Sequence, residues 1–245
     1  MFGMKDAIYK LRRSFSLPEP PATKLDPNTK NFDDFDDFLP SVNLTGYSAN
    51  TKNRLLTTDM CDEIRTLMPM RVQLYNEWTL LYSLEQHGAS LHSLYDNIKP
   101  KDDDLTRRIG YVIVIKDAKN GIFGAYCNEP WEPNEHVRYY GNGECFLWKM
   151  NKVPNLNLDD KNDPDNKQLT QWQFQGFPYT GVNEFAIYCT SRFLSMGAGD
   201  GHYGLWCDDG LLHGVTYPCS TYGNETLSQE GNKFHIIGLE VWRVG

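Results

Sequence analysis

The segment 109–126, IGYVIVIKDAKNGIFGAY, most constrains what this chain can fold into, because it predicts a β-hairpin. Two runs rich in β-branched and aromatic residues flank DAKNG, whose Asn-Gly pair favours a tight turn. Similar apolar runs recur at 78–83, 143–150, 172–177 and 234–244. Roughly eight strands joined by turns or short helices predict an α+β fold, with two antiparallel sheets packed as a sandwich and flanked by short helices.

Short helices are expected between some of these strands. One spans 58–68, because Thr57 can cap its start, its apolar residues recur at helical spacing and Pro69 stops it. A second follows Ser90, another capping residue. A helical turn is also predicted at 221–228.

The segment 181–214 carries the most unusual pattern. An apolar run at 185–188 is followed by a glycine-dense hinge, with Gly-Ala-Gly-Asp-Gly at 197–201, and then by a second apolar run at 203–206. Three glycines in five residues predict positive φ angles or the close approach of another backbone. We interpret 197–201 as a loop between two core strands, followed by an Asp-Asp-Gly turn and a third strand.

Charge and cysteine usage narrow the class of protein. The chain of 245 residues has a net charge of −8, so generic nucleic-acid binding, which needs a basic face, is not expected. No apolar run approaches the roughly 20 residues that span a bilayer, and we expect a soluble chain. The six cysteines are scattered without a CxxC pair, which predicts reduced, mostly buried thiols in a cytosolic type of compartment.

The N-terminal segment 1–15 predicts a basic amphipathic helix. It could dock on its own domain, contact a partner or a membrane surface, or act as a mitochondrial presequence, against which Asp6 counts. One face of this helix carries Met4, Ile8, Leu11 and Phe15, and the basic residues elsewhere are Lys5, Lys10, Arg12 and Arg13.

Residues 16–40 form a Pro-rich, acidic stretch, which we interpret as a disordered linker ahead of a folded domain at 41–245. Phenylalanines alternate there with paired aspartates in NFDDFDDF, so a short partner-docking motif is the alternative to a solvated tether. The polar segment 151–171 is expected to be a surface insertion.

The glycine-rich segment is a candidate phosphate-binding or metal-binding loop. It has no lysine and runs into a strand rather than a helix, so it matches neither a P-loop nor a dinucleotide fingerprint. Acids and histidines lie close together in this region, but they do not form an EF-hand, and no close Cys/His pair marks a zinc site. His202 and His213 could meet across a hairpin as a weak site. The prediction is that no metal and no cofactor is bound.

Three glutamates are candidates for acid–base chemistry. Glu144 and Glu184 each open an apolar strand, and Glu240 lies on the last one, so the three carboxylates could share one sheet face. We favour a structural role, in which Glu144 and Glu184 accept backbone N–H bonds or pair with arginines. The candidate arginines are Arg108, Arg138 and Arg192.

Thiol chemistry is the remaining enzymatic alternative, and it needs an exposed cysteine of low pKa. Cys127 and Cys219 lie at strand ends and are the better candidates. The cysteines inside strands, Cys145, Cys189 and Cys207, are expected to be buried and inert. A redox-active or hydrolytic enzyme using Cys219 or the Glu144/Glu184 pair is therefore the alternative function.

Several long motifs together resemble one family. The motifs are similar to a TLDc domain and occur in order over 44–245: WTLLYSLEQHGASLHSLY, GYVIVIKDAKNGIFGAY, YYGNGECFLWK, EFAIYCTSRFLSMGAGDGHYGLWCDDGLLHG and a final LEVW. The N-terminal helix is similar to that of budding-yeast members. The resemblance implies a β-sandwich without enzymatic activity that protects against oxidative damage. It also implies binding to the vacuolar-type proton ATPase (V-ATPase), with separation of the pump's soluble catalytic sector from its membrane sector.

The resemblance also shapes the expected partners and location. The partners that it implies are peripheral-stalk and catalytic-head subunits of the soluble sector. The location that it implies is the cytoplasm, with recruitment to the vacuolar membrane. A mitochondrial pool is a further alternative. The glycine segment departs slightly from the family pattern by containing Asp200. The residues expected to bind the partner are Gly197, Gly199, Asp200, Gly201 and His202 in that segment and Lys5, Ile8, Leu11 and Arg12 in the N-terminal helix.

Overall fold

The computed structural model describes residues 39–101, 109–134, 138–154 and 170–245. The chain divides into two compact units, Met1–Phe38 and Leu39–Gly245, and only the second lies within the described residues. The predicted N-terminal helix and nearly all of the predicted linker therefore lie outside them. So do Arg108 and most of the polar insertion.

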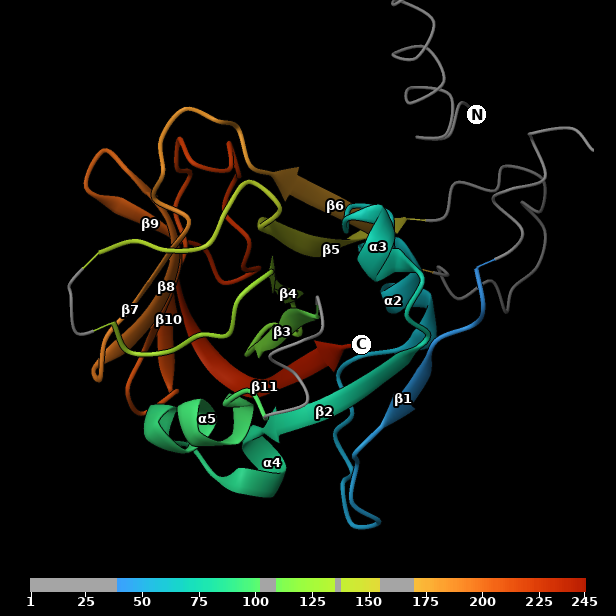
Figure 1. Ribbon diagram of the computed structural model, residues 1–245. Coiled ribbons are helices and arrows are strands. Elements are labelled where there is room, and N and C mark those ends of the chain that lie inside the picture. The colour runs from blue at the N-terminus through green and yellow to red at the C-terminus, as the bar shows by residue number, and fades with distance from the viewer. Residues whose placement is uncertain (1–38, 102–108, 135–137, 155–169) are drawn as a thin grey trace, which may run out of the picture. The chain divides into compact units, whose positions relative to one another are not determined.

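The described part has eleven hydrogen-bonded strands (Figure 1). Nine of them follow one path, in the order β6-β5-β4-β3-β11-β10-β9-β8-β7, and the other two, β1 and β2, branch from β11. All neighbours pair antiparallel except β1 and β2, which are parallel. The strands are β1 (Asn43–Thr45), β2 (Glu77–Ser83), β3 (Gly110–Asp117), β4 (Ile122–Cys127), β5 (Phe146–Pro154), β6 (Thr170–Pro178), β7 (Ile187–Cys189), β8 (Phe193–Gly199), β9 (His202–Asp208), β10 (His213–Val215) and β11 (Lys233–Val244). The helices are α2 (Thr58–Arg65), α3 (Met70–Gln73), α4 (Leu84–His87) and α5 (Leu91–Ile98).

The long strand β11 belongs to two sheets. Its first residues pair with β10 in sheet B, which contains β7–β10, whereas its last residues pair with β2 in sheet A, which contains β1–β6. Along its other edge β11 pairs with β3, with a register shift between Ile236 and Gly238. In Figure 1 the red ribbon of β11 runs from the β7–β10 side of the molecule toward β2 and β3. The two layers form the predicted antiparallel sandwich, with β11 as their shared strand.

Sheet A is buried on both of its faces. One face shares a core with sheet B and α5, and the other face packs under α2, α3 and the segment before them. Alternation along β3 sends successive side chains to the two cores, so the whole strand except Lys116 is buried. Large residues of the first core are Tyr82, Ile113, Phe123, Leu147 and Val241. Large residues of the second are Trp78, Val114, Trp148 and Trp242.

Local predictions with clear end signals are confirmed. The Thr57 side chain caps α2 by accepting from the Met60 backbone N–H, and Ser90 caps α5 through Ser93. The predicted hairpin is β3–β4, and Asn120 takes the positive φ of 62° that its turn requires.

Other predictions are wrong. The region 221–228 contains turns and no helix, and the described part has eleven strands rather than eight. The strand β8 is not among the predicted strands, because its glycines by themselves are typical of a hinge. That difference changes the candidate site.

Candidate functional site

The glycine-rich segment is a tight hairpin rather than a loop. Gly199 pairs with His202, so only Asp200 and Gly201 lie between β8 and β9. Both turn residues have positive φ angles, 52° and 78°, which match the twist of the flanking strands. The exposed part of the predicted partner-binding segment is therefore the tip formed by Asp200, Gly201 and His202.

Gly197 and Gly199 are needed because another segment packs against them. A Cβ atom on Gly197 would lie 2.6 Å from Tyr222 Cδ2 and 2.7 Å from Cys219 Sγ, and one on Gly199 would collide with Ser220 Oγ. The segment 219–222 is also tied to β8, since Thr221 Oγ1 accepts a 3.0 Å hydrogen bond from the Ala198 N–H. Gly197 is buried in this contact, so it shapes the hairpin from beneath.

Six aromatic rings of sheet B and the loops beside it form a continuous chain of contacts that branches at Phe193, which we call the aromatic ladder. Successive ring centroids lie 4.7–6.0 Å apart, within the range of favourable aromatic pairs. Alternation along the strands places Tyr188, Phe193 and Trp206 on the face opposite the core residues, where all three side chains are half-buried. The rings belong to Tyr139, Phe185, Tyr188, Phe193, Tyr203 and Trp206.

The ladder begins at an open pocket and ends beside the hairpin tip. The pocket has a volume of about 550 Å³, and Tyr139 and Phe185 line it together with Arg138 and Glu184. Phe185 is 41% exposed, and Tyr203 follows His202 of the hairpin tip directly in β9. The ladder is not predicted from the sequence, because aromatic residues in apolar runs are typical of a core. The available signal is that Tyr188, Phe193 and Trp206 alternate with buried residues on one side of their strands.

The three candidate glutamates lie in separate places. Glu144 forms an ion pair with Arg71, which is none of the predicted arginines, and Glu184 lies at the open pocket. Glu240 is buried, and four donors hold its carboxylate. The donors are Tyr47 Oη at 2.9 Å, Leu55 N at 3.1 Å, Leu56 N at 3.3 Å and Trp242 Nε1 at 3.0 Å.

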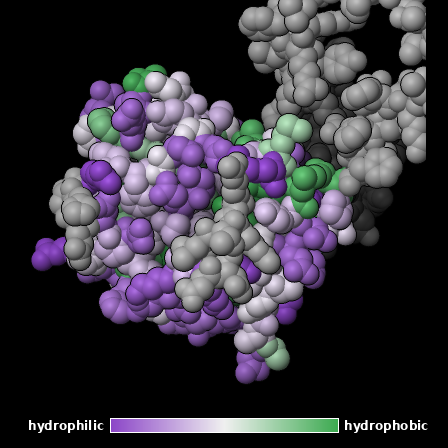
Figure 2. Space-filling view, viewed as in Figure 1, coloured by the Kyte–Doolittle hydropathy of each residue, from purple (hydrophilic) through white to green (hydrophobic). Residues whose placement is uncertain are grey.

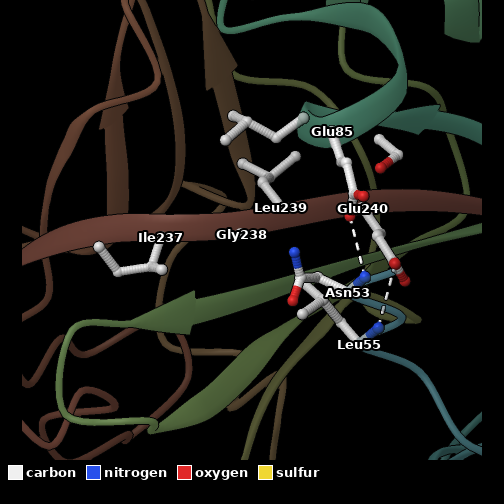
Figure 3. A pocket seen from close by; sticks show the side chains of 9 residues that line it. Asn53, Leu55, Glu85, Ile237, Gly238, Leu239 and Glu240 are labelled. Atoms are coloured by element: carbon white, nitrogen blue, oxygen red, sulfur yellow. Dashed lines mark hydrogen bonds between the residues drawn. The ribbon is translucent and has the colours of Figure 1, made fainter. Parts of the chain in front are cut away.

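Glu240 lies on β11 where its pairing with β2 begins, beyond the residues of β11 that pair with β10. Burial raises the pKa of its carboxyl group even though the hydrogen bonds act in the opposite direction. Beside it lies a cavity of about 240 Å³, shown in Figure 3. A second carboxylate there, Glu85, accepts hydrogen bonds of 2.9 Å from the Lys52 and Asn53 backbone N–H groups. Both carboxylates therefore serve to hold the segment before α2 against the sheet.

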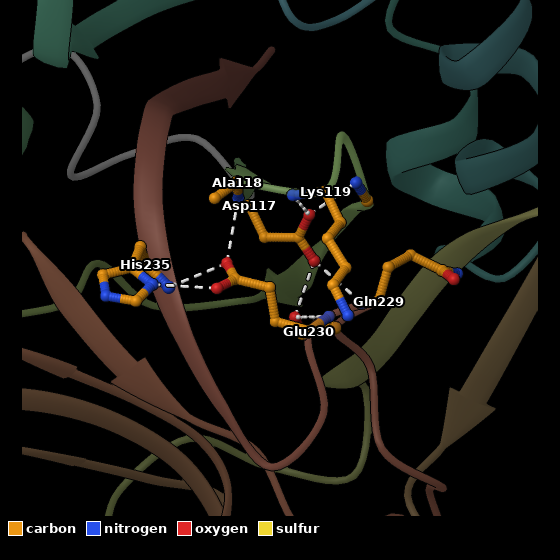
Figure 4. A network of polar contacts seen from close by, with 8 residues as sticks. Asp117, Ala118, Lys119, Gln229, Glu230 and His235 are labelled. Carbon is orange, nitrogen blue, oxygen red and sulfur yellow. Dashed lines mark hydrogen bonds and ion pairs between the residues drawn. The ribbon is translucent and has the colours of Figure 1, made fainter.

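A second polar anchor ties the β3–β4 hairpin to the segment before β11 (Figure 4). Asp117 is buried and accepts from the backbone of Gly121 at 2.6 Å and from Ser228 Oγ at 2.6 Å. Beside it, Glu230 accepts from the Ala118 N–H and from His235. Burial alone would raise the pKa of Glu230, but the hydrogen bonds from His235 and Ala118 outweigh it and lower that pKa.

A model of the TLDc domain matches residues 49–245. This chain belongs to the TLDc-domain family. It is 58% identical to oxidation resistance protein 1 of Saccharomyces cerevisiae, with the whole of both chains covered, and 56% identical to the protein of the same name from Candida glabrata, also over both whole chains. It is 68% identical to oxidation resistance protein 1 of Kluyveromyces lactis, over 86% of this chain and 83% of that one.

The cysteines of this TLDc domain are all buried, which corrects the expectation for Cys127 and Cys219. Burial raises the pKa of both thiols, so neither forms a thiolate readily. The pKa of Cys145 is lowered, chiefly by a hydrogen bond from Cys127, but that side chain is fully buried. The geometry therefore disfavours a nucleophilic or peroxide-reactive thiol.

The histidines of the TLDc domain pair differently from the weak site that the sequence suggested. His202 stacks on Tyr217, with ring centroids 4.4 Å apart, and does not meet His213. His213 instead lies beside His235, its register partner across β10 and β11. Within the described ranges, no group of three or more histidine, cysteine or acidic side chains is placed to hold a metal ion. None of the described helices is both long and apolar enough to cross a membrane.

Proposed function

We propose that this chain binds and regulates the V-ATPase, promoting separation of the pump's soluble sector from its membrane sector, and that it protects against oxidative damage without being an enzyme. The name that the yeast relatives carry, oxidation resistance protein 1, supports the protective role. The resemblance of the motifs to the TLDc family supports the pump as the partner. The buried thiols, the ion pair of Glu144 with Arg71 and the buried hydrogen-bonded Glu240 favour a binding role over catalysis.

The aromatic ladder is the observation that carries the binding proposal. Half-buried aromatic rings dominate the binding energy of many protein interfaces, because each offers a large rigid contact area at a small entropic cost. The ladder lies on the face of sheet B opposite its core, between the open pocket and the hairpin tip. We propose that the ladder and the tip together contact peripheral-stalk and catalytic-head subunits of the soluble sector.

The proposed regulation requires the chain to distinguish two states of the pump. A ligand shifts an equilibrium only through its difference in affinity for the two states. Moving a pump population from about 1:99 to 99:1 takes a preference of about 10⁴-fold for the detached sector. A sandwich with two rigid cores suits this role, because its surface does not adapt to the disfavoured state.

The location and the N-terminal segment are part of the same proposal. We place the chain in the cytoplasm, with recruitment to the vacuolar membrane through the pump. Residues 1–15 are proposed to add a second contact with the soluble sector or to supply a mitochondrial pool. Affinity purification of the tagged full chain and of a chain lacking residues 1–40 tests this contribution, since a second contact predicts weaker recovery of pump subunits with the truncated chain.

A binding experiment with the purified soluble sector tests the role of the ladder. Phe185→Ala removes a ring beside the open pocket and Trp206→Ala removes one in β9, and we expect each to weaken binding by about tenfold or more. The matched control is Met70→Ala with Leu74→Ala on α3, which truncates apolar side chains that are 83% and 67% exposed elsewhere. Figure 2 shows a mainly hydrophilic face whose hydrophobic residues gather beside the α2–α3 region.

The control decides how the result is interpreted. If the α3 variant weakens binding as much as the ladder variants, the effect is general apolar contact and the ladder is not the site. If the ladder variants bind like the unmodified chain, the proposal fails for this face. Thermal unfolding of each variant shows whether a loss of binding reflects a loss of fold.

A further inference from the structure

Two exposed histidines lie side by side on sheet B, outside the aromatic ladder. The register of β10 and β11 pairs His213 with His235, and their ring centroids are 5.5 Å apart. Their side chains are 63% and 62% exposed, so solvent reaches both rings. The proposed pump binding makes no use of either residue.

A carboxylate holds each ring at the same atom. His213 Nδ1 lies 3.1 Å from Asp208 Oδ2, and His235 Nδ1 lies 2.8 Å from Glu230 Oε2. An ionised carboxylate can only accept a hydrogen bond, so the neutral rings carry their proton on Nδ1 and keep a lone pair on Nε2. Neither Nε2 atom has a hydrogen-bond partner among the residues that the structure describes.

This arrangement is typical of histidines that bind metal ions. Such histidines usually donate their second ring N–H to a carboxylate, which fixes the tautomer and makes the free nitrogen a better ligand. Here both carboxylates are themselves fixed. Asp208 also accepts from the Leu212 and His213 backbone N–H groups, and Glu230 also accepts from Ala118.

We infer that His213 and His235 form a two-histidine site for a divalent transition-metal ion, zinc or copper(II), with water completing the coordination. With zinc–nitrogen bonds of about 2.0–2.1 Å and a tetrahedral angle, two imidazoles that share one ion have centroids about 5.2 Å apart. The observed centroid separation of 5.5 Å is close to this value. Imidazole suits both ions, and copper(II) is expected to bind more tightly than zinc.

Binding at this site has a structural consequence. The strand β10 contains only three residues, and a shared ion would join it to β11 through side chains as well as backbone hydrogen bonds. Because an ion that binds only the folded chain raises its stability, zinc is expected to raise the thermal unfolding temperature.

Calorimetric titration of the full chain with zinc chloride, and separately with copper(II) chloride, tests the site at neutral pH. We expect one saturable site, and His213→Gln or His235→Gln should each weaken it by about tenfold or more. Asp208→Asn and Glu230→Gln keep the ligands but change the group at Nδ1, and about tenfold weakening is expected. The matched control is His202→Gln, an exposed histidine of the same sheet, which should bind like the unmodified chain.

Three outcomes would overturn the inference. They are the absence of saturable binding at millimolar metal, an equal loss of affinity in His202→Gln, and normal affinity in either His213→Gln or His235→Gln. Unfolding temperatures measured without metal identify any variant that is damaged in its fold. If a variant is damaged in its fold, NMR of the unmodified chain takes its place. Added metal should then shift the ring signals of His213 and His235 together and leave the ring signals of His202 unchanged.

Discussion

The two sheets of this sandwich differ in how many of their faces are covered. Sheet A contributes to two cores, so a strand such as β3 is buried almost throughout. Among the described residues, sheet B contributes to only one core, and β9 mixes buried and half-buried residues after an exposed His202. The same type of residue therefore has different roles in the two sheets. An aromatic ring in sheet A stabilises the fold, whereas one on the outer face of sheet B is available to a partner.

Two tryptophans give the largest expected contrast between the sheets. Trp242 is fully buried in sheet A, and Trp242→Ala should lower the free energy of unfolding by about 3–5 kcal/mol through lost contacts and a residual cavity. Trp206 is half-buried on the outer face of sheet B, and Trp206→Ala should lower it by about 1 kcal/mol or less while weakening partner binding. Urea unfolding measures both, and equal losses would remove the distinction between the sheets.

Substitutions at two glycines of the β8–β9 hairpin distinguish the cost of steric overlap from the cost of backbone strain within sheet B. Gly197 has a positive φ of 69° and contacts Tyr222 and Cys219, so Gly197→Ala should lower the free energy of unfolding by about 2–4 kcal/mol. Gly201 also has a positive φ, but its Cβ position is open, so Gly201→Ala should lower it by only about 1 kcal/mol. Chemical denaturation compares the two. A larger loss for Gly201 would contradict the packing explanation.

A substitution of Glu240 tests how β11, the strand shared by the two sheets, is stabilised. Its amide variant, Glu240→Gln, has one acceptor oxygen for four donors and should lose about 1–3 kcal/mol of unfolding free energy at pH 7. Because burial raises the pKa of Glu240 in the folded state, the folded chain binds this proton more tightly than the unfolded chain. The unmodified chain should therefore gain stability over the variant as pH falls from 7 toward 5. A gap that narrows over this range would mean that the folded pKa is lowered instead.

The sequence predicted the parts of this fold that local chemistry determines. Thr57 and Ser90 mark helix starts within one turn of chain, and the Asn-Gly pair marks the β3–β4 turn. The strand β8 was missed because its glycines are explained only by the segment 219–222, which packs on them from elsewhere in the chain.

The candidate site depends on the same kind of distant contact. Nothing near Glu144 in the sequence indicates that Arg71 is its partner. The pairing of His213 with His235 follows from a strand register that sequence periodicity does not specify. Predictions from local pattern therefore located most of the strands, with β8 as an exception, and located the contacts between strands poorly.

The smallest effect is expected from the cysteine that the thiol hypothesis favoured. Cys219 packs under the β8–β9 hairpin, where it donates to Asn224 Oδ1 and burial raises its pKa. Cys219→Ala should lower the free energy of unfolding by about 1 kcal/mol, because one small buried group and a weak hydrogen bond are lost.

Protection of cells against peroxide should be unchanged, since a buried thiol of raised pKa reacts slowly with oxidants. Survival assays with this variant, with Cys127→Ala as a matched buried thiol, measure the result. If Cys219→Ala abolishes protection while Cys127→Ala retains it at similar stability, sheet B carries redox chemistry as well as a binding face.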